Sequence, residues 1–269
     1  MHIIRIKPKP LLSPFIAHYW LWQSTHHPYV PDILPGTGAE LLINLGEPLV
    51  ISHPFHHQLL MGQSLLVCPR RATFKFETTG GSKLISVRFR SSGCYSIFGI
   101  PMDELSDKII DMYQFLPESL IERLIMKVND LDKIQLLESW FIGLLNPKLT
   151  TSSGITWAID KTYYQQNHQG ISGLQLEVNM SKRTLQRKFK LYTGVDAKYF
   201  ERTARFQSTL RTQLNGTSNN YVDIALDNGY YDQPHFIKEF RYFTGMSPKK
   251  YLIKANFMLN HYNKYIFTF

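Results

Sequence analysis

Residues 182–195 read KRTLQRKFKLYTGV and residues 235–246 read HFIKEFRYFTGM, so one short pattern occurs twice in this chain. In each copy apolar residues lie four positions apart among basic and polar ones, and the pattern ends in Thr-Gly. Thr193-Gly194 recurs 51 positions later as Thr244-Gly245. Residues four apart share one face of a helix, and glycine commonly follows a helix C-terminus. The pattern therefore predicts two copies of a basic helix with one buried face.

The first copy has the features of a helix-turn-helix unit. SGLQLEV at 172–178 predicts a short helix, and Ser181 can cap the next helix after a tight turn. In this motif the second helix enters the major groove of DNA. Leu185 and Phe189 lie four apart and are expected to face inward. Arginine and glutamine can then pair with base edges. The side chains left facing outward are Lys182, Arg183, Gln186, Arg187 and Lys190.

The second copy follows the same logic. NNYVDIALDNG at 219–229 predicts a short helix closed by its glycine, and Asp232 can cap the helix that follows. Pro234 is tolerated there because N–H groups of a first helical turn have no helical partner. Phe236 and Phe240 take the inward places. The outward residues are Gln233, His235, Lys238 and Arg241.

One continuous helix is predicted between the two copies, over residues 196–214, because this stretch contains no helix breaker. Two recognition helices held by a rigid helix can enter successive major grooves about 34 Å apart on one face of a duplex. A plain helical bundle with basic surfaces would explain either copy alone. The pair is better explained by a protein that reads an asymmetric DNA site of about two turns.

The charge distribution agrees with a polyanionic partner. The chain of 269 residues has a formal net charge of +9, and residues 155–254 contain fifteen cations against eight anions. A basic C-terminal part beside a nearly neutral N-terminal part indicates nucleic acid first and an anionic membrane second. A merely basic surface remains the alternative that charge alone leaves open.

The first 90 residues have the pattern of short strands. Runs rich in β-branched and aromatic residues alternate with turns, and Gly80-Gly81 can supply positive φ in a hairpin. This pattern predicts an antiparallel sandwich or small barrel. The predicted strands are 40–46, 48–52, 64–69, 73–78 and 83–90.

Two amphipathic helices are predicted after the strands, at 117–128 and 132–145. They can cover the open face of the β structure or pair with a second subunit, and the sequence favours neither alternative. The polar stretch 146–153 is the expected linker. The chain is thus predicted to be α+β: a β-rich domain at 1–148, an all-α domain at 153–255 and a tail at 256–269.

The two helix-turn-helix copies resemble the DNA-binding domain of AraC/XylS-type regulators. The resemblance rests on LQLEVNMSKRTLQRKFKLYTGVDAKYF and IALDNGYYDQPHFIKEFRYFTGMSPKKYL, including Gly-Tyr-x-Asp-Gln at 229–233 and Gly-x-Ser-Pro-x-x-Tyr at 245–251. It covers about residues 153–252. The family implies a sequence-specific transcription regulator that binds double-stranded DNA, with RNA polymerase and a second copy of the chain as further candidate partners.

The resemblance also assigns roles to residues. It places Arg183, Gln186 and Arg187 of the first helix at base-reading positions, with Gln233, Pro234, His235 and Lys238 of the second. The phosphate contacts expected are Lys182, Thr184, Lys190 and Arg241. Two residues depart from the family pattern: Gln175 replaces a small alanine, and Pro234 cannot make a polar base contact. The second helix is therefore expected to read fewer bases or mainly to grip phosphate.

The N-terminal half resembles the sensor half of one subgroup of AraC-type regulators, which is cupin-like in the wider family. The stretches concerned are ILPGTGAELLINLGEP and RFRSSGCYSIFGIPMDELSDKI. The resemblance implies a domain that binds a small-molecule effector or mediates dimerisation. Aromatic residues such as Tyr19, Trp20 and Trp22 are either core or pocket lining. Control by a protein partner, with no small ligand, is the alternative.

Catalysis is disfavoured, and no cofactor is expected. The histidine-rich stretches 26–28 and 53–57 are the best metal candidates, but each adjoins proline and is predicted to be an exposed loop. A cupin-type metalloenzyme fused to a DNA-binding module is the rival that bound metal would support. Cys68 and Cys94 are expected to be free and buried. A start with early prolines and no long apolar run predicts a cytoplasmic protein without a membrane segment.

Overall fold

The structure is a computed structural model, and it describes most of the chain in eleven segments. They are residues 2–24, 29–53, 56–61, 64–69, 71, 73–78, 81–112, 115–150, 153–164, 170–214 and 221–251. The tail predicted at 256–269 and the histidine-rich stretch at 26–28 lie outside these residues.

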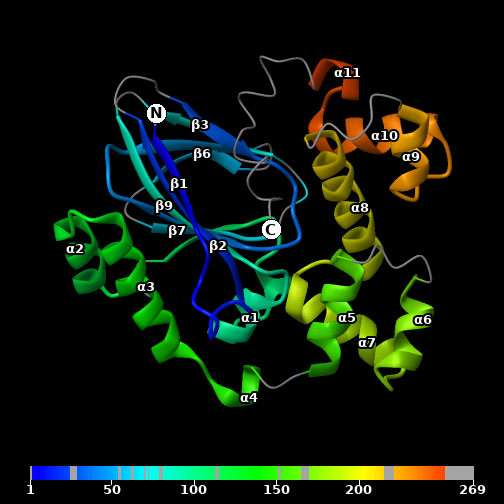
Figure 1. Ribbon diagram of the computed structural model, residues 1–269, viewed down its shortest axis with the longest axis horizontal. Helices are drawn as coiled ribbons and strands as arrows, with labels where there is room; N and C mark the ends of the chain where they lie inside the picture. The colour runs from blue at the N-terminus through cyan, green and yellow to red at the C-terminus, as the bar shows by residue number, and fades with distance from the viewer. Residues whose placement is uncertain are drawn as a thin grey trace.

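The N-terminal part consists of two antiparallel sheets, as predicted (Figure 1). In the larger sheet the strands lie in the order β1 (His2–Ile6), β2 (Ile16–Ser24), β9 (Ser82–Phe89), β4 (Glu40–Asn44), β7 (Ser64–Val67) and β10 (Ile109–Asp111). In the smaller sheet the order is β3 (Tyr29–Ile33), β8 (Phe74–Thr78), β5 (Leu49–His53) and β6 (His56–Met61).

Alternate residues of β2 face opposite sides of the larger sheet, because side-chain direction alternates along a strand. Tyr19 and Leu21 belong to the core that this sheet forms with the helices, whereas Trp22 packs into the core shared with the smaller sheet. The helices after and beside the sheet are α1 (Gly93–Phe98), the 3₁₀ helix η1 (Met102–Glu104), α2 (Glu118–Met126), α3 (Asp130–Leu144) and α4 (Pro147–Thr150).

The two helices predicted at 117–128 and 132–145 cover the larger sheet. Leu120, Ile121 and Leu124 of α2 are buried in the same core as the sheet residues, and Figure 1 shows α2 and α3 on one side of the strands. The helix predicted at 117–128 was too long at its end, since α2 ends at Met126, and two apolar residues of that stretch, Ile125 and Val128, are exposed, Val128 to 96%. The short helix α4 lies within the predicted linker.

The C-terminal part is helical, as predicted. In Figure 1, α8 runs from the group of α5, α6 and α7 to the group of α9, α10 and α11. The bounds are α5 (Ser153–Tyr164), α6 (Gly170–Glu177), α7 (Lys182–Thr193), α8 (Ala197–Leu214), α9 (Tyr221–Asp227), α10 (Gln233–Thr244) and α11 (Pro248–Tyr251).

Both predicted caps of the repeated helices are present. The Ser181 hydroxyl accepts the Thr184 N–H at 3.2 Å, and the Asp232 carboxylate accepts the His235 N–H at 2.7 Å. These bonds satisfy backbone donors that lack a helical partner. Gly194 follows α7 with φ 78°.

The repeated Thr-Gly closes each helix in the same way. The Thr193 hydroxyl bonds the Phe189 carbonyl at 2.8 Å, and the Thr244 hydroxyl bonds the Phe240 carbonyl at 2.8 Å. Each glycine then takes the left-handed conformation that an L side chain rarely adopts, with Gly245 at φ 72°. The sequence repeat is therefore a repeat of helix ends as well as of helix faces.

The two parts of the chain share a core. Trp20 and Leu34 from the N-terminal part belong to the buried cluster of the C-terminal helices. Gln207 of α8 donates a hydrogen bond to the Pro35 carbonyl at 3.3 Å, and the rings of Tyr95 and Tyr192 lie 4.2 Å apart. The sheet domain thus contacts the helices through packed side chains and not through the chain connection alone.

Candidate nucleic-acid interface

Helix α7 exposes the polar face that the sequence predicts. Leu185 and Phe189 are completely buried, while Arg183, Gln186 and Arg187 are exposed. Residues of α7 and of the start of α8 line a groove of about 480 Å³. The lining residues are Arg183, Gln186, Arg187, Lys190, Asp196, Ala197 and Lys198. Four of these seven side chains are cationic, so the groove suits an anionic partner.

Lys198 was not among the predicted site residues. It lies on the first turn of α8 but lines the same groove as Lys190 of α7. The sequence shows that Lys198 follows the repeated helix closely. It does not show that the turn at 194–196 folds α8 back toward α7, which brings Lys198 to the groove. Lys182 and Thr184 occupy the first turn of α7, and the Thr184 hydroxyl accepts a hydrogen bond from Ser181 at 3.0 Å.

Helix α10 repeats the arrangement of buried apolar and exposed polar residues, but fewer of its predicted site residues are exposed polar side chains. Phe236 and Phe240 are completely buried, and Lys238 and Arg241 are exposed. Pro234 is also exposed, and Gln233 is half-buried.

His235 is held in place by its neighbours. Its Nδ1 accepts the Tyr231 N–H at 3.3 Å, and its ring lies edge-on to Tyr230 at 5.5 Å. Because Nδ1 is an acceptor, the neutral ring carries its proton on Nε2 and can donate a hydrogen bond from that atom. A fixed donor of this kind suits an acceptor on a base edge or a phosphate.

Helix α8 packs on both α7 and α10. The ring of Phe200 lies 5.0 Å from that of Phe189 on α7, and the ring of Phe206 lies 5.5 Å from that of Phe240 on α10. Arg202 of α8 also forms two hydrogen bonds to Glu239 of α10. Helix α8 therefore contacts the buried faces of both α7 and α10.

The metal candidates do not form a centre among the described residues. No group of three or more histidine, cysteine, aspartate or glutamate side chains suited to a metal lies within those residues. The loop prediction for 53–57 is wrong in part, because His53 ends β5 and pairs with His56 at the start of β6. Cys68 and Cys94 are buried and form no disulfide within the part of the chain that the structure describes, and burial raises the pKa of the Cys94 thiol. Within the described residues no helix is long and apolar enough to span a bilayer.

Two family models match separate parts of the chain. Residues 4–111 match a domain of unknown function (DUF6597), and residues 176–253, from the end of α6 to α11, match a helix-turn-helix domain.

Among curated proteins, uncharacterized HTH-type transcriptional regulators of Staphylococcus aureus strains MSSA476 and COL are each 33% identical over 81 residues. The aligned part is 30% of this chain and 11% of each relative, so the chain spans about a tenth of their length.

Solved structures of ToxT from Vibrio cholerae are similar in arrangement. One at 10% identity has a TM-score of 0.49 and covers 87% of this chain and 97% of that chain. Another, with an unsaturated fatty acid bound, has 9% identity and a TM-score of 0.46 and covers 93% of each chain.

Two capped helices with exposed basic faces, each closed by Thr-Gly and joined by α8, occupy the region that matches the helix-turn-helix family. The C-terminal part of this chain is therefore a helix-turn-helix domain, as its resemblance to the DNA-binding domain of AraC/XylS-type regulators implies.

Proposed function

We propose that this protein is a sequence-specific transcription regulator that reads two successive major grooves of DNA with α7 and α10. The observation that carries the proposal is the pairing of two recognition helices on one helix, α8, with their apolar faces buried and their polar faces exposed. Rigid mounting lets both helices meet one face of the duplex about one turn apart.

Helix α7 makes the larger contribution to sequence reading. Arg183 and Arg187 reach guanine O6 and N7, and Gln186 reaches adenine N6 and N7. On α10 the readers are Gln233, His235 and Lys238, with Pro234 limited to apolar contact. Phosphate contacts come from Lys182, Thr184, Lys190 and Arg241, to which the groove geometry adds Lys198.

The N-terminal part controls DNA binding through an effector that presents a polar group to His18. This side chain is 1% exposed, and neither ring nitrogen has a hydrogen-bond partner among the described residues. Burial, aided by Arg5 and Arg88, holds the pKa of His18 well below its ordinary value, so the ring is neutral. A buried polar group without a partner costs free energy, which a ligand group can recover.

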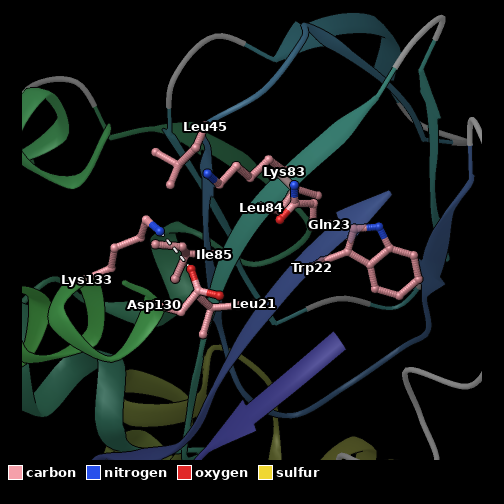
Figure 2. Close-up of a pocket in the computed structure, with 9 residues that line it drawn as sticks. All are labelled: Leu21, Trp22, Gln23, Leu45, Lys83, Leu84, Ile85, Asp130 and Lys133. Atoms are coloured by element: carbon pink, nitrogen blue, oxygen red, sulfur yellow. Dashed lines mark hydrogen bonds and ion pairs between the residues drawn. The ribbon is translucent and has the colours of Figure 1, made fainter. Parts of the chain in front are cut away.

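The cavity beside His18 is small and lies where the two parts of the chain meet. Its volume is about 20 Å³, room for about one water molecule, and Tyr163 and Tyr164 of α5 form part of its wall. A second cavity of about 10 Å³ has Leu21, Ile85 and the ion pair of Lys133 with Asp130 in its lining (Figure 2). Binding of an effector larger than water at His18 therefore requires α5 to move relative to the sheet.

Selection of bound DNA from a random pool, with the full-length protein at near-physiological salt, tests the proposed function. The expected result is a site with two unequal boxes about one helical turn apart. Arg183→Ala should lose the preference at one position of the stronger box, while Arg123→Ala, an exposed arginine on α2, should select the same site as the wild type. A pool that gives no common sequence would contradict sequence-specific reading.

A further inference from the structure

One turn of the N-terminal part contacts elements that hold both recognition helices. This η1 turn, residues 102–108, begins with the 3₁₀ helix η1 and leads directly into β10 at the edge of the larger sheet. It is fixed to that sheet, since the Asp107 N–H bonds the Pro69 carbonyl at 3.0 Å and the Cys68 N–H bonds the Lys108 carbonyl at 3.2 Å. Met102 is buried in the core of the sheet and helices.

The first contact is at the joint between α7 and α8. The Ser106 hydroxyl donates a hydrogen bond to the Gly194 carbonyl. A Cβ added at Gly194 would lie 2.6 Å from Ser106 Oγ and 2.7 Å from the Met102 carbonyl oxygen, so the two backbones meet without room for a side chain. Gly194 ends α7, and α8 begins three residues later at Ala197. The η1 turn therefore packs against the joint at which α7 and α8 would change their relative orientation.

The second contact is between Arg71, which Asp107 of the η1 turn binds, and α8, the helix that packs on α10. Asp107 accepts the Arg71 N–H at 2.7 Å, and its other carboxylate oxygen lies 3.6 Å from the Arg71 guanidinium. That guanidinium lies 5.4 Å from the ring centroid of Tyr199 on α8. Arg71 is thus placed by the η1 turn and packs against the helix that supports α10.

Tyr199 belongs to the contact between α8 and α10. Its ring lies 6.2 Å from that of Phe243 on α10, and the guanidinium of Arg202 lies 6.0 Å from the same Tyr199 ring. Arg202 in turn forms its two hydrogen bonds to Glu239. The chain of contacts from Asp107 through Arg71 and Tyr199 therefore ends on the buried side of the second recognition helix.

We propose that the η1 turn positions α7 relative to α10 and so sets the spacing between DNA boxes that the protein accepts. The inference rests on the proposed reading of two grooves. Two separate attachments, one at the α7–α8 joint and one on the face of α8 that supports α10, restrict rotation of one recognition helix relative to the other. Arg71 is half exposed, so its ion pair with Asp107 is weak alone and biases the arrangement without locking it.

The test measures binding to a series of DNA sites. The full-length protein is titrated with its selected two-box site, with sites whose boxes are one base pair closer or farther apart, and with a single box. The variant is Ser106→Ala combined with Arg71→Ala. The matched control is Ser139→Ala combined with Arg123→Ala, two exposed side chains on α3 and α2.

The wild type and the control should prefer the selected spacing by about tenfold, within the usual range of coupling between sites, and the variant by about twofold. Binding of the variant to a single box should equal that of the wild type. Thermal melting checks that the variant folds. Arg71→Ala alone removes only a half-exposed side chain and should show a smaller loss of the preference.

The outcomes separate the two proposals. A wild type that selects no two-box site contradicts the proposed function. A wild type with a clear spacing preference that the folded variant keeps, or that Arg71→Ala leaves unchanged, overturns the positioning role alone. An equal loss of affinity by the variant on every site, the single box included, also overturns it, because the contacts would then merely stabilise the domain.

Discussion

Arg202 and Glu239 tie α8 to the buried side of α10 through two parallel hydrogen bonds of 2.8 and 2.9 Å. Glu239 is buried, and the bond with it raises the pKa of Arg202. The guanidinium also lies 4.7 Å from the ring centroid of Tyr242. The planar guanidinium can form two hydrogen bonds to one carboxylate and stack on an aromatic ring at the same time. The ammonium group of a lysine cannot do both.

Arg202→Ala should therefore destabilise the protein by about 2 kcal/mol, because it leaves the Glu239 carboxylate buried without its cation. Urea unfolding measures the loss. Arg123→Ala, which removes an exposed arginine from α2, should change stability by less than about 0.5 kcal/mol. Equal effects of the two substitutions would mean that the pair contributes little.

Arg183→Ala should cost about 1 to 3 kcal/mol of binding free energy on the selected site and relax the preference at one base pair. The side chain is exposed on α7 and lines the basic groove. Titration against sites mutated at each position gives the result. A uniform loss on all sequences would instead make Arg183 a phosphate contact.

Lys190→Ala and Lys198→Ala should each weaken binding to any DNA sequence and reduce the salt slope by about one ion. The two lysines come from different helices but line the same groove. Affinities measured over a salt series give the slope. A substitution that leaves the slope unchanged would remove that lysine from the interface.

Stability should fall as the pH is lowered below the ordinary His18 pKa of 6.5, because the unfolded chain binds a proton that the folded protein excludes. The contribution of the neutral His18 ring to the free energy of unfolding is fully present above pH 6.5. Below that pH it is lost at up to about 1.4 kcal/mol per pH unit. His18→Gln should remove this slope, so the comparison is the difference between wild type and variant in urea unfolding over a pH series. That difference is needed because burial raises the pKa of Asp160 and Glu201, whose titration acts in the opposite direction. Parallel curves for the two proteins would contradict a buried neutral His18.

The elements that the sequence predicts well are those with local signals. Ser181 and Asp232 cap helices because their short polar side chains reach a backbone N–H three residues on, and this geometry needs no distant partner. Leu185 and Phe189 share a face because of helical spacing alone. The same reasoning applied to α2 failed at Val128, because the helix ends at Met126 and the periodic pattern outlasts it.

Contacts between distant residues could not be predicted in this way. Ser106 and Gly194 are 88 positions apart, and nothing in either stretch indicates the other. Tyr199 sits in a helix whose pattern shows only that one face is buried, and neither its packing on Phe243 nor the approach of Arg71 follows from that pattern. Tertiary packing decides such pairs, and it depends on how the sheet docks on the helices.

The threonines at the ends of α7 and α10 have a consequence for how a protein with the proposed function can change its DNA target. Thr193 and Thr244 bond backbone carbonyls and take no part in the outward faces. Identity between the copies is thus concentrated where each helix ends, and the residues that would meet DNA differ. The outward-facing residues of one helix could therefore be replaced without disturbing the Thr-Gly end of that helix or the other helix. The two DNA boxes that the protein recognises could then change independently.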